Sequence, residues 1–295
     1  MPKLVLSFDS HALSTFQRCP EEFRLTHVKH LETAQSKSFY DNGTLVHLML
    51  GLYYRLRRRG YSVEKASMAV IEKRYQRFCS KFPISQEDKM LILTRFAEYV
   101  SHYRNEMHQP VGIEVGFSEK LYENDSFIFI YEGRVDWIGK TFVEKMGRIL
   151  HFEDHKTRSQ NYELDVQKNQ FYGYAWMMKK VFGKDYDGWG SVNYFGLQAD
   201  KSQKMRKDGS LFERVWFQFS DKEILQWEKD TIFWFFRIAQ AMLHNVFPRT
   251  WQCDRKFGVC PMKKICVQPE DWQKKLVMID GVYFKRREKK WTAWE

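Results

Sequence analysis

The 295-residue sequence lacks several features that would assign it to a class at once. It has no run of eighteen apolar residues and no secretory-leader pattern, which predicts a soluble, cytoplasmic protein and no membrane association. No internal repeat, low-complexity linker or GxxxxGK[ST] phosphate loop occurs, so we expect neither a repeat array nor a helicase motor.

Cysteine is scarce and its count is odd, with Cys19, Cys79, Cys253, Cys260 and Cys266. An odd number in a chain expected inside the cell argues against a disulfide framework. Cys79 lies in a predicted helix and is interpreted as a small buried hydrophobic residue. The last three cysteines fall within fourteen residues, CDRKFGVCPMKKIC, so that segment needs an explanation of its own.

Apolar, aromatic and basic residues are abundant in the sequence. Apolar residues make up 43% and aromatic residues 17% of the chain, which indicates a folded globular protein. Lys and Arg number 48 against 37 Asp and Glu, giving a formal net charge of +11 and a pI near 9.3. This surplus predicts a polyanionic partner, nucleic acid first and an acidic membrane surface second.

The order of predicted elements favours a mixed α/β (α+β) fold. A short extended piece at the start precedes a helix capped near Asp9 or Ser10, and a second helix can begin at Pro20. Further helices are predicted over 39–58, 63–81 and 87–108, so the first hundred residues should be largely helical. Strands are expected only from Val111 onward, with later helices over 165–181 and 220–244.

Two acidic residues follow predicted strands in the middle of the chain. Asp136 ends the strand over 127–135, and Asp154 follows the strand over 149–152. Asp154 and Lys156 are two residues apart, so on a strand they point to the same face. Such carboxylates can hold a hard divalent cation, and the ammonium group can orient a water or stabilise charge on an attacked phosphate.

The competing interpretation is a solvated strand end, because an acid followed two residues later by lysine is common. Only one of the four such pairs in the chain ends an apolar strand that is preceded by a second strand with its own acid. These pairs are Glu87/Lys89, Asp154/Lys156, Asp254/Lys256 and Glu288/Lys290. We therefore favour a metal site at Asp154. His47, by contrast, lies among Leu, Met and Tyr in a predicted helix, and its position alone indicates a satisfied core residue.

Several motifs in a fixed order carry a resemblance to a known family. They are His47, G-x-x-D ending at Asp136, D-x-K at Asp154 and Lys156, and Q-x-x-x-Y at Gln170 and Tyr174. In this order the chain resembles the PD-(D/E)XK nuclease superfamily. Within it, the opening motif over Ser10–Pro20 and the late cysteines resemble the RecB-type branch and the CRISPR-associated and phage-encoded iron–sulphur exonucleases. The likeness covers Ser7 to Cys266.

The resemblance implies a restriction-endonuclease-like fold, a mixed central sheet flanked by helices. It also implies a single nuclease domain over 1–270, with an N-terminal helical insert at about 60–108. The cysteine segment 248–270 would close onto Cys19, and a basic, aromatic tail would occupy 271–295.

Residue roles follow from the resemblance alone. His47 becomes a metal ligand, against the interpretation from its position, and the backbone carbonyl of His155 completes a set with Asp136 and Asp154. The implied catalytic residues are Lys156, Asp154 and Asp136; the implied substrate-binding residues are Gln170, Tyr174 and Thr157; Glu114 is a secondary metal candidate. The metal is expected to be Mg²⁺ or Mn²⁺, and the imidazole among the ligands favours Mn²⁺.

The resemblance further implies that Cys19, Cys253, Cys260 and Cys266 bind a [4Fe–4S] cluster, since thiolates are the ligands of such clusters. Many relatives have a C-x-x-C pair at the start of the late group, whereas this chain has wider spacing. A structural Zn²⁺ therefore stays as the alternative.

The sequence thus predicts a metal-dependent deoxyribonuclease, an exonuclease in preference to an endonuclease. It would hydrolyse single-stranded or end-containing DNA in recombination, repair or phage DNA metabolism, alone or with a helicase, recombinase or CRISPR-adaptation partner. The alternative is a non-catalytic DNA-binding accessory subunit of a recombination or CRISPR-adaptation complex. That alternative is disfavoured because every expected active-site residue is present.

Overall fold

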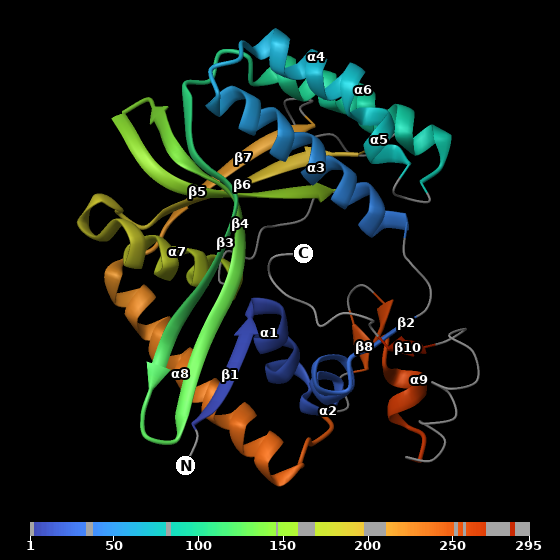
Figure 1. Cartoon of the computed structure of the whole chain (residues 1–295), viewed down its shortest axis with the longest axis vertical. Coiled ribbons are helices and arrows are strands. Elements are labelled where there is room, and N and C mark those ends of the chain that lie inside the picture. The colour runs from blue at the N-terminus through green and yellow to red at the C-terminus, as the bar shows by residue number, and fades with distance from the viewer. Residues whose placement is uncertain are drawn as a thin grey trace. The chain divides into compact units, whose positions relative to one another are not determined.

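The computed structural model describes residues 3–33, 38–80, 84–145, 147–158, 169–197, 211–250, 253–255, 258–269 and 284–286. The chain forms two compact units, each assembled from separate segments (Figure 1). Unit 1 consists of residues 1–36, 116–133 and 225–295, and unit 2 of residues 37–115 and 134–224. A single nuclease domain over 1–270 stays a prediction.

A mixed sheet runs through the described residues, as expected for the α/β class. Its strands follow the order β1, β4, β5, β6, β7, and β3 pairs with β4. The pairs β1–β4 and β5–β6 are parallel, whereas β4–β5 and β6–β7 are antiparallel. The bounds are β1 Leu4–Asp9, β3 His108–Glu123, β4 Phe127–Val143, β5 Gly147–Arg158, β6 Trp189–Gly196 and β7 Phe212–Gln218.

Strand β1 corrects the expectation that the sheet begins at Val111. It pairs in parallel with the start of β4, Leu4 opposite Phe127 and Asp9 opposite Glu132. Its six residues alternate weakly in burial, with Leu6 buried and Val5 exposed. So short a strand is stabilised by its partner more than one hundred residues later in the chain, and local sequence pattern does not report such a partner.

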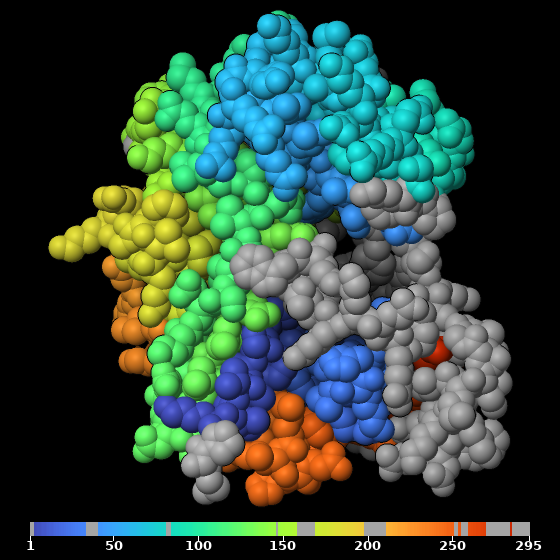
Figure 2. All heavy atoms as spheres, viewed as in Figure 1, coloured from blue at the N-terminus to red at the C-terminus, as the bar shows by residue number. Residues whose placement is uncertain are grey.

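Unit 2 has helices on both faces of its strands (Figure 1). Helices α3, α4, α5 and α6 cover one face of β5, β6 and β7, where Tyr99 of α6 packs on Phe195 and Phe212. Helix α7 covers the other face, where Tyr174 packs on Phe152. Side chains of α4, α5 and α6 form the cyan surface in Figure 2. The bounds are α3 Ser38–Arg58, α4 Val63–Lys73, α5 Tyr75–Cys79, α6 Gln86–His102, α7 Asn169–Phe182 and η2 Gly183–Asp185.

Two predicted helix boundaries were wrong. The helix expected over 63–81 is broken at Arg74, where φ is −125°, so that α5 can turn and bury Tyr75. The helix expected over 87–108 ends at His102, six residues early. The side chain of Ser85 caps α6 by accepting a hydrogen bond from the Asp88 N–H at 3.0 Å. Cys79 is buried, as predicted.

Unit 1 packs short helices and the aromatic face of α8 against β1 and the first half of β4. Asp9 caps α1 through the Ala12 N–H at 2.8 Å, and Pro20 is the first residue of α2, both as predicted. Phe235 of α8 packs on Phe129, with ring centroids 5.3 Å apart. The bounds are α1 Ser10–Arg18, α2 Pro20–Phe23, the π-helical turn η1 Arg24–Val28, β2 Leu31–Thr33 and α8 Asp221–His244, of which Leu225 onward belongs to this unit.

The cysteine segment of unit 1 forms a small core of its own. Strand β10 pairs antiparallel with β2, Phe284 opposite Thr33. Leu25, Leu31 and Ile265 are buried there. The bounds are β8 Asp254–Arg255, β9 Gly258–Val259, α9 Lys263–Cys266 and β10 Phe284–Arg286. The rest of the predicted tail over 271–295 lies outside the described residues, as do residues 198–210.

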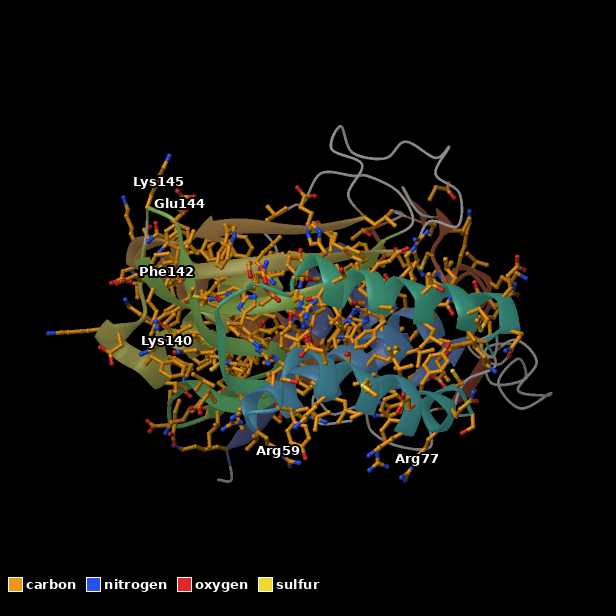
Figure 3. All side chains as sticks on the ribbon, turned by 90° about the horizontal axis from the view of Figure 1, so that it is seen from above. Arg59, Arg77, Lys140, Phe142, Glu144 and Lys145 are labelled. Atoms are coloured by element: carbon orange, nitrogen blue, oxygen red, sulfur yellow. The ribbon has the colours of Figure 1, made fainter. Side chains whose placement is uncertain are left out.

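The β4–β5 hairpin of unit 2 ends at a solvent-facing tip. The tip turns through Lys145, which has φ 72°, and Gly147, which has φ 77°. Lys140 and Phe142 are exposed near it (Figure 3). None of the described helices combines the length and apolar character needed to cross a membrane.

A buried polar network joins the strands of unit 2 to its helical layer. Arg214 of β7 forms ion pairs with Glu153 and with Glu106. Asn193 donates to Glu153 at 3.1 Å and to the Tyr99 hydroxyl at 2.5 Å. Burial by itself raises the pKa of Glu153, but the Arg214 guanidinium holds that pKa well below its usual range. The buried charges are therefore paired and hydrogen-bonded, which is the condition under which burial is tolerated.

His151 lies beside this network and is fully buried between two tryptophans. Its ring centroid is 4.8 Å from that of Trp137 and 4.6 Å from that of Trp216. Burial lowers the pKa of His151 to about 3, so the ring is neutral in the folded protein. The unfolded chain takes up a proton on this residue near pH 6.5. Above pH 6.5 the burial of His151 does not make the free energy of unfolding depend on pH. As pH falls from 6.5 towards 3, proton uptake by the unfolded chain progressively lowers that free energy.

Replacing His151 with Phe should make stability less sensitive to acid. Between pH 7 and pH 5 the wild-type protein should lose about 2 kcal/mol more unfolding free energy than His151→Phe, because only the wild type has this proton uptake on unfolding. Urea unfolding at the two pH values measures the difference. The exposed His102→Gln variant serves as control and should lose as much as wild type. Equal losses in His151→Phe and wild type would refute the assignment.

Candidate active site

Two glycines of helix α3 share a face with His47. Gly43, His47 and Gly51 are spaced by four residues, which places them on one side of the helix. A Cβ atom on Gly43 would lie 3.2 Å from Thr157 Oγ1, and one on Gly51 would lie 3.4 Å from Glu114 Oε1. Each glycine inside a helix costs about 1 kcal/mol of stability relative to alanine, so glycines four residues before and after a histidine need a reason. This spacing is a sequence signal for the site that the predictions above do not use.

His47 faces an acidic group and not the apolar core. Its Nδ1 lies 3.5 Å from Asp136 Oδ2. One ligand atom from each of His47, Glu114 and Asp136 lies within 4.8 Å of the others, and no other such group of three occurs among the described residues. Ligands around one Mg²⁺ or Mn²⁺ lie about 3 to 4 Å apart when the bonds are about 2.1 Å long. The spacing and the donor atoms therefore fit a hard divalent cation.

Glu114 joins this group through an unusual backbone conformation. Its φ of 53° is left-handed although it lies in β3. A non-glycine residue in that region costs about 1–2 kcal/mol. Gly112 accommodates the bend, because a Cβ there would lie 2.4 Å from the Val115 side chain. The sequence offered no signal for this geometry, and Glu114 was only a secondary candidate. Strain of this kind concentrates at functional sites.

Asp154 and Lys156 lie on one face of β5, as predicted, and two residues of α7 hold them. Lys156 Nζ is 2.8 Å from Asp154 Oδ2. The side-chain amide of Gln170 donates to Asp154 Oδ1 at 3.1 Å and to the Tyr174 hydroxyl at 2.8 Å. The Tyr174 hydroxyl in turn donates to the Arg134 carbonyl oxygen at 2.6 Å. The Q-x-x-x-Y motif therefore braces the acid and lysine against β4.

The two aspartates come together where β4 and β5 part. In the antiparallel register, Trp137 pairs with Glu153. Asp136 on β4 and Asp154 on β5 are the residues next to this pair. Beyond that pair, the Asp136 carboxylate accepts a hydrogen bond from the His155 N–H at 2.7 Å. The His155 ring stacks on Tyr54 of α3, with centroids 5.8 Å apart and planes 5° from parallel. A role for the His155 carbonyl stays a prediction.

The charges of the site are strongly coupled. Burial alone would lower the pKa of His47, but the carboxylate of Asp136 outweighs it and raises the pKa to about 9. Burial likewise opposes ionisation of Asp136, yet His47 holds its pKa far below the usual range. Burial raises the pKa of Asp154 and of Glu114, and the neighbouring Asp136 raises both further. Three acids at such close range repel one another, and a bound cation would relieve that repulsion.

The four predicted cluster cysteines all belong to unit 1, whereas Cys79 belongs to unit 2. The Thr250 hydroxyl donates to the Arg18 carbonyl at 2.7 Å, and the Glu21 N–H to the Pro248 carbonyl at 3.3 Å. The chain entering the cysteine segment therefore runs beside Cys19. Burial raises the pKa of Cys266 to about 11, with smaller contributions from its neighbours, including Cys19 and Cys253. No three of these sulphur atoms come within 4.8 Å of one another, and the cluster stays a prediction.

A family model described as the PD-(D/E)XK nuclease superfamily matches residues 10–267. The chain belongs to the PD-(D/E)XK nuclease superfamily. It is therefore a metal-dependent nuclease with DNA as its substrate class. The RecB-type branch is a finer prediction. No curated protein matches the chain.

Two solved structures are distantly similar. One is a proposed exonuclease from Eubacterium rectale, with 11% identity, a TM-score of 0.45, and coverage of 87% of this chain and 91% of that one. The other is SSO0001, with 13% identity, a TM-score of 0.28, and coverage of 82% and 89%. Similarity at this level carries no information about the site.

Removing a carboxylate from the group should weaken metal binding. Asp136→Asn should lower the affinity for Mn²⁺ at least about tenfold, and Glu114→Gln should lower it to a smaller or similar degree. Isothermal titration with Mn²⁺ measures the affinity, and the metal-induced rise in melting temperature checks it independently. The exposed Glu72→Gln variant is the matched control. Unaltered Mn²⁺ affinity in Asp136→Asn would exclude this group as the metal site.

Proposed function

We propose that the protein is an exodeoxyribonuclease that hydrolyses phosphodiester bonds in single-stranded or end-containing DNA. The observation that carries the proposal is the group of His47, Glu114 and Asp136 beside the Asp154–Lys156 pair. A divalent cation held by His47, Glu114 and Asp136, with Asp154 and the His155 carbonyl as further ligands, would polarise the scissile phosphate and lower the pKa of a bound water.

Lys156 is the residue assigned to the attacked phosphate. Its ammonium group lies between Asp154, 2.8 Å away, and Gln170 Oε1, 3.4 Å away, and about a third of its side chain is exposed. A cation fixed by two partners and open to solvent can orient the attacking water and stabilise the charge that develops on the phosphate. Because both partners are already in place, this arrangement needs little reorganisation during the reaction.

Gln170 and Tyr174 have a positioning role in this proposal, besides the substrate contact predicted from their motif. Tyr174 is buried, and its hydroxyl is occupied by Gln170 and by the Arg134 carbonyl. Gln170 is half-buried and orients both Asp154 and Lys156. Thr157, half-buried and facing Gly43 of α3, is a further candidate for contact with the DNA strand.

The proposed setting is recombination, repair or phage DNA metabolism, with a helicase, recombinase or CRISPR-adaptation protein as possible partner class. The net charge of +11 supports a polyanionic substrate. A non-catalytic accessory subunit is the second candidate, and the retained Asp154–Lys156 pair disfavours it, since every active-site residue expected from the motifs is present.

Replacing Lys156 with Ala should abolish cleavage while folding and DNA binding persist, because the residue acts on the transition state. End-labelled single- and double-stranded DNA, incubated with Mg²⁺, Mn²⁺ or EDTA, measures cleavage. We expect a loss of at least about a hundredfold in rate. The exposed Lys184→Ala variant is the control and should cut as wild type does.

A covalently closed single strand of the same sequence tests the requirement for an end. An exonuclease leaves this circle intact and degrades the linear form, whereas cutting of the circle would make the protein an endonuclease. Binding without cleavage by the wild-type protein in both metals would favour the accessory subunit. Near wild-type cleavage by Lys156→Ala would remove the D-x-K assignment.

We propose further that Cys19, Cys253, Cys260 and Cys266 hold a [4Fe–4S] cluster, with a structural Zn²⁺ as the alternative. Support comes from the hydrogen bonds that tie residues 248–250 to Arg18 and Glu21, and from the shared core of Cys253, Cys260 and Cys266. The centre would connect the first helix to the last segment of unit 1, and no hydrolytic residue belongs to that unit.

Protein purified without oxygen should be brown, with visible absorbance that bleaches on reduction, because thiolate-bound iron–sulphur clusters absorb there. Cys260→Ser should lose the colour and unfold more easily, whereas Cys79→Ser should keep both colour and activity. Metal analysis decides the alternative. A colourless protein with one tightly bound zinc would support the zinc site, and a preparation with neither metal would exclude both.

A further inference from the structure

Arg134 lies at the edge of the metal group. It precedes Asp136 by two residues on β4, so both side chains leave the strand on the same face. Its Nε lies 3.0 Å from Glu114 Oε2. The Arg134 side chain is 41% exposed, against 15% for Glu114 and 8% for Asp136. The guanidinium group therefore extends from the buried acids to solvent.

The backbone of Arg134 is fixed relative to the catalytic pair. Its carbonyl oxygen accepts the Tyr174 hydroxyl at 2.6 Å, and Gln170 connects that tyrosine to Asp154. The side chain thus starts from a defined point beside the D-x-K residues, and its outer part is exposed to solvent. A cation placed in this way can contact DNA that enters the site.

Breaking the ion pair between Arg134 and Glu114 costs little free energy. A partly exposed ion pair contributes about 0–1 kcal/mol. The fork of guanidinium N–H groups matches the oxygens of a phosphate, and hydrogen bonds to charged groups contribute about 1.5–3 kcal/mol each. When Glu114 binds a divalent cation, its charge is shared and its hold on Arg134 weakens. The Arg134 guanidinium group then pairs more favourably with a phosphate than with Glu114.

We propose that Arg134 binds a backbone phosphate of the DNA strand next to the scissile bond, and that Glu114 holds its guanidinium group until metal is bound. The inference rests on the proposed nuclease function and extends it, because it assigns a phosphate-binding site to a position that the G-x-x-D motif leaves unspecified. Arg55, which lies on α3 four residues after Gly51 and lowers the pKa of Glu114, adds positive charge on the same side.

The competing explanation is that Arg134 only orients Glu114 for the metal. The two explanations predict opposite effects on metal affinity. If Arg134 binds phosphate, its removal takes away a cation that competes for Glu114, and Mn²⁺ binds as tightly as before or more tightly. If Arg134 orients Glu114, its removal weakens Mn²⁺ binding.

The test uses the full chain carrying Lys156→Ala, so that DNA stays uncut, with and without Arg134→Gln. Fluorescence anisotropy with a labelled single strand at saturating Mn²⁺ should show DNA affinity falling about tenfold or more. The slope of log affinity against log salt should become shallower by roughly 0.7, the value for one phosphate contact on a single strand. Calorimetry without DNA should show Mn²⁺ affinity unchanged or increased.

The matched control is Arg77→Gln, which removes the same charge from an exposed position of α5, where the side chain points away from the protein (Figure 3). It should leave the DNA affinity and the salt slope close to those of the parent. Arg134→Lys keeps the charge without the fork and should lose part of the affinity, which guards against a folding defect in Arg134→Gln.

DNA affinity of Arg134→Gln equal to that of Arg77→Gln would overturn the proposal, and so would weaker Mn²⁺ binding with DNA affinity unchanged. Neither result would affect cleavage by the protein with Lys156 intact, so the nuclease function would stand. Failure of the parent to bind DNA at all in Mn²⁺ would instead count against both the nuclease function and the phosphate site.

Discussion

The site depends on how closely helix α3 can lie against the ends of β4 and β5. Gly43 and Gly51 flank His47 on one face of the helix. A Cβ atom added at Gly43 would lie 3.2 Å from Thr157 Oγ1, and one added at Gly51 would lie 3.4 Å from Glu114 Oε1. A side chain at Gly43 would crowd Thr157, and one at Gly51 would contact Glu114. The two glycines therefore leave room for these residues beside His47, and the helix accepts their lower intrinsic stability.

The electrostatics of the site follow from that approach. His47, Lys156 and Arg134 each pair with one acid, at 3.5, 2.8 and 3.0 Å. A divalent cation would displace the proton of His47 and loosen Arg134 but leave Lys156 in place, because Gln170 also holds that lysine. The three cationic side chains therefore have different roles. His47 is a metal ligand, Arg134 can turn to the substrate, and Lys156 stays fixed beside the reacting phosphate.

Features set by local periodicity could be predicted from the sequence. The two-residue repeat of a strand placed Asp154 and Lys156 on one face, and the side chains of Asp9 and Ser85 marked helix starts. Features set by tertiary contact could not. The histidine among apolar residues indicated core by position, β1 depends on a distant partner strand, and nothing in the sequence around Glu114 announces its left-handed backbone. His47 could be predicted as a ligand only from the motif order of the superfamily, because that order reflects tertiary contacts that local sequence rules do not describe.

One strained residue and two helix-weakening glycines lie beside the metal group. A left-handed Glu114 costs about 1–2 kcal/mol, and each of the two glycines in α3 costs about 1 kcal/mol. These costs are a sizeable part of the 5–15 kcal/mol that holds a typical domain folded. In the buried network of the same unit, Arg214 is paired with both Glu153 and Glu106. The acids around Glu114 and Asp136 instead lie close to one another beside a strained backbone, and the chemistry of a bound cation and a phosphate would provide a reason for that arrangement.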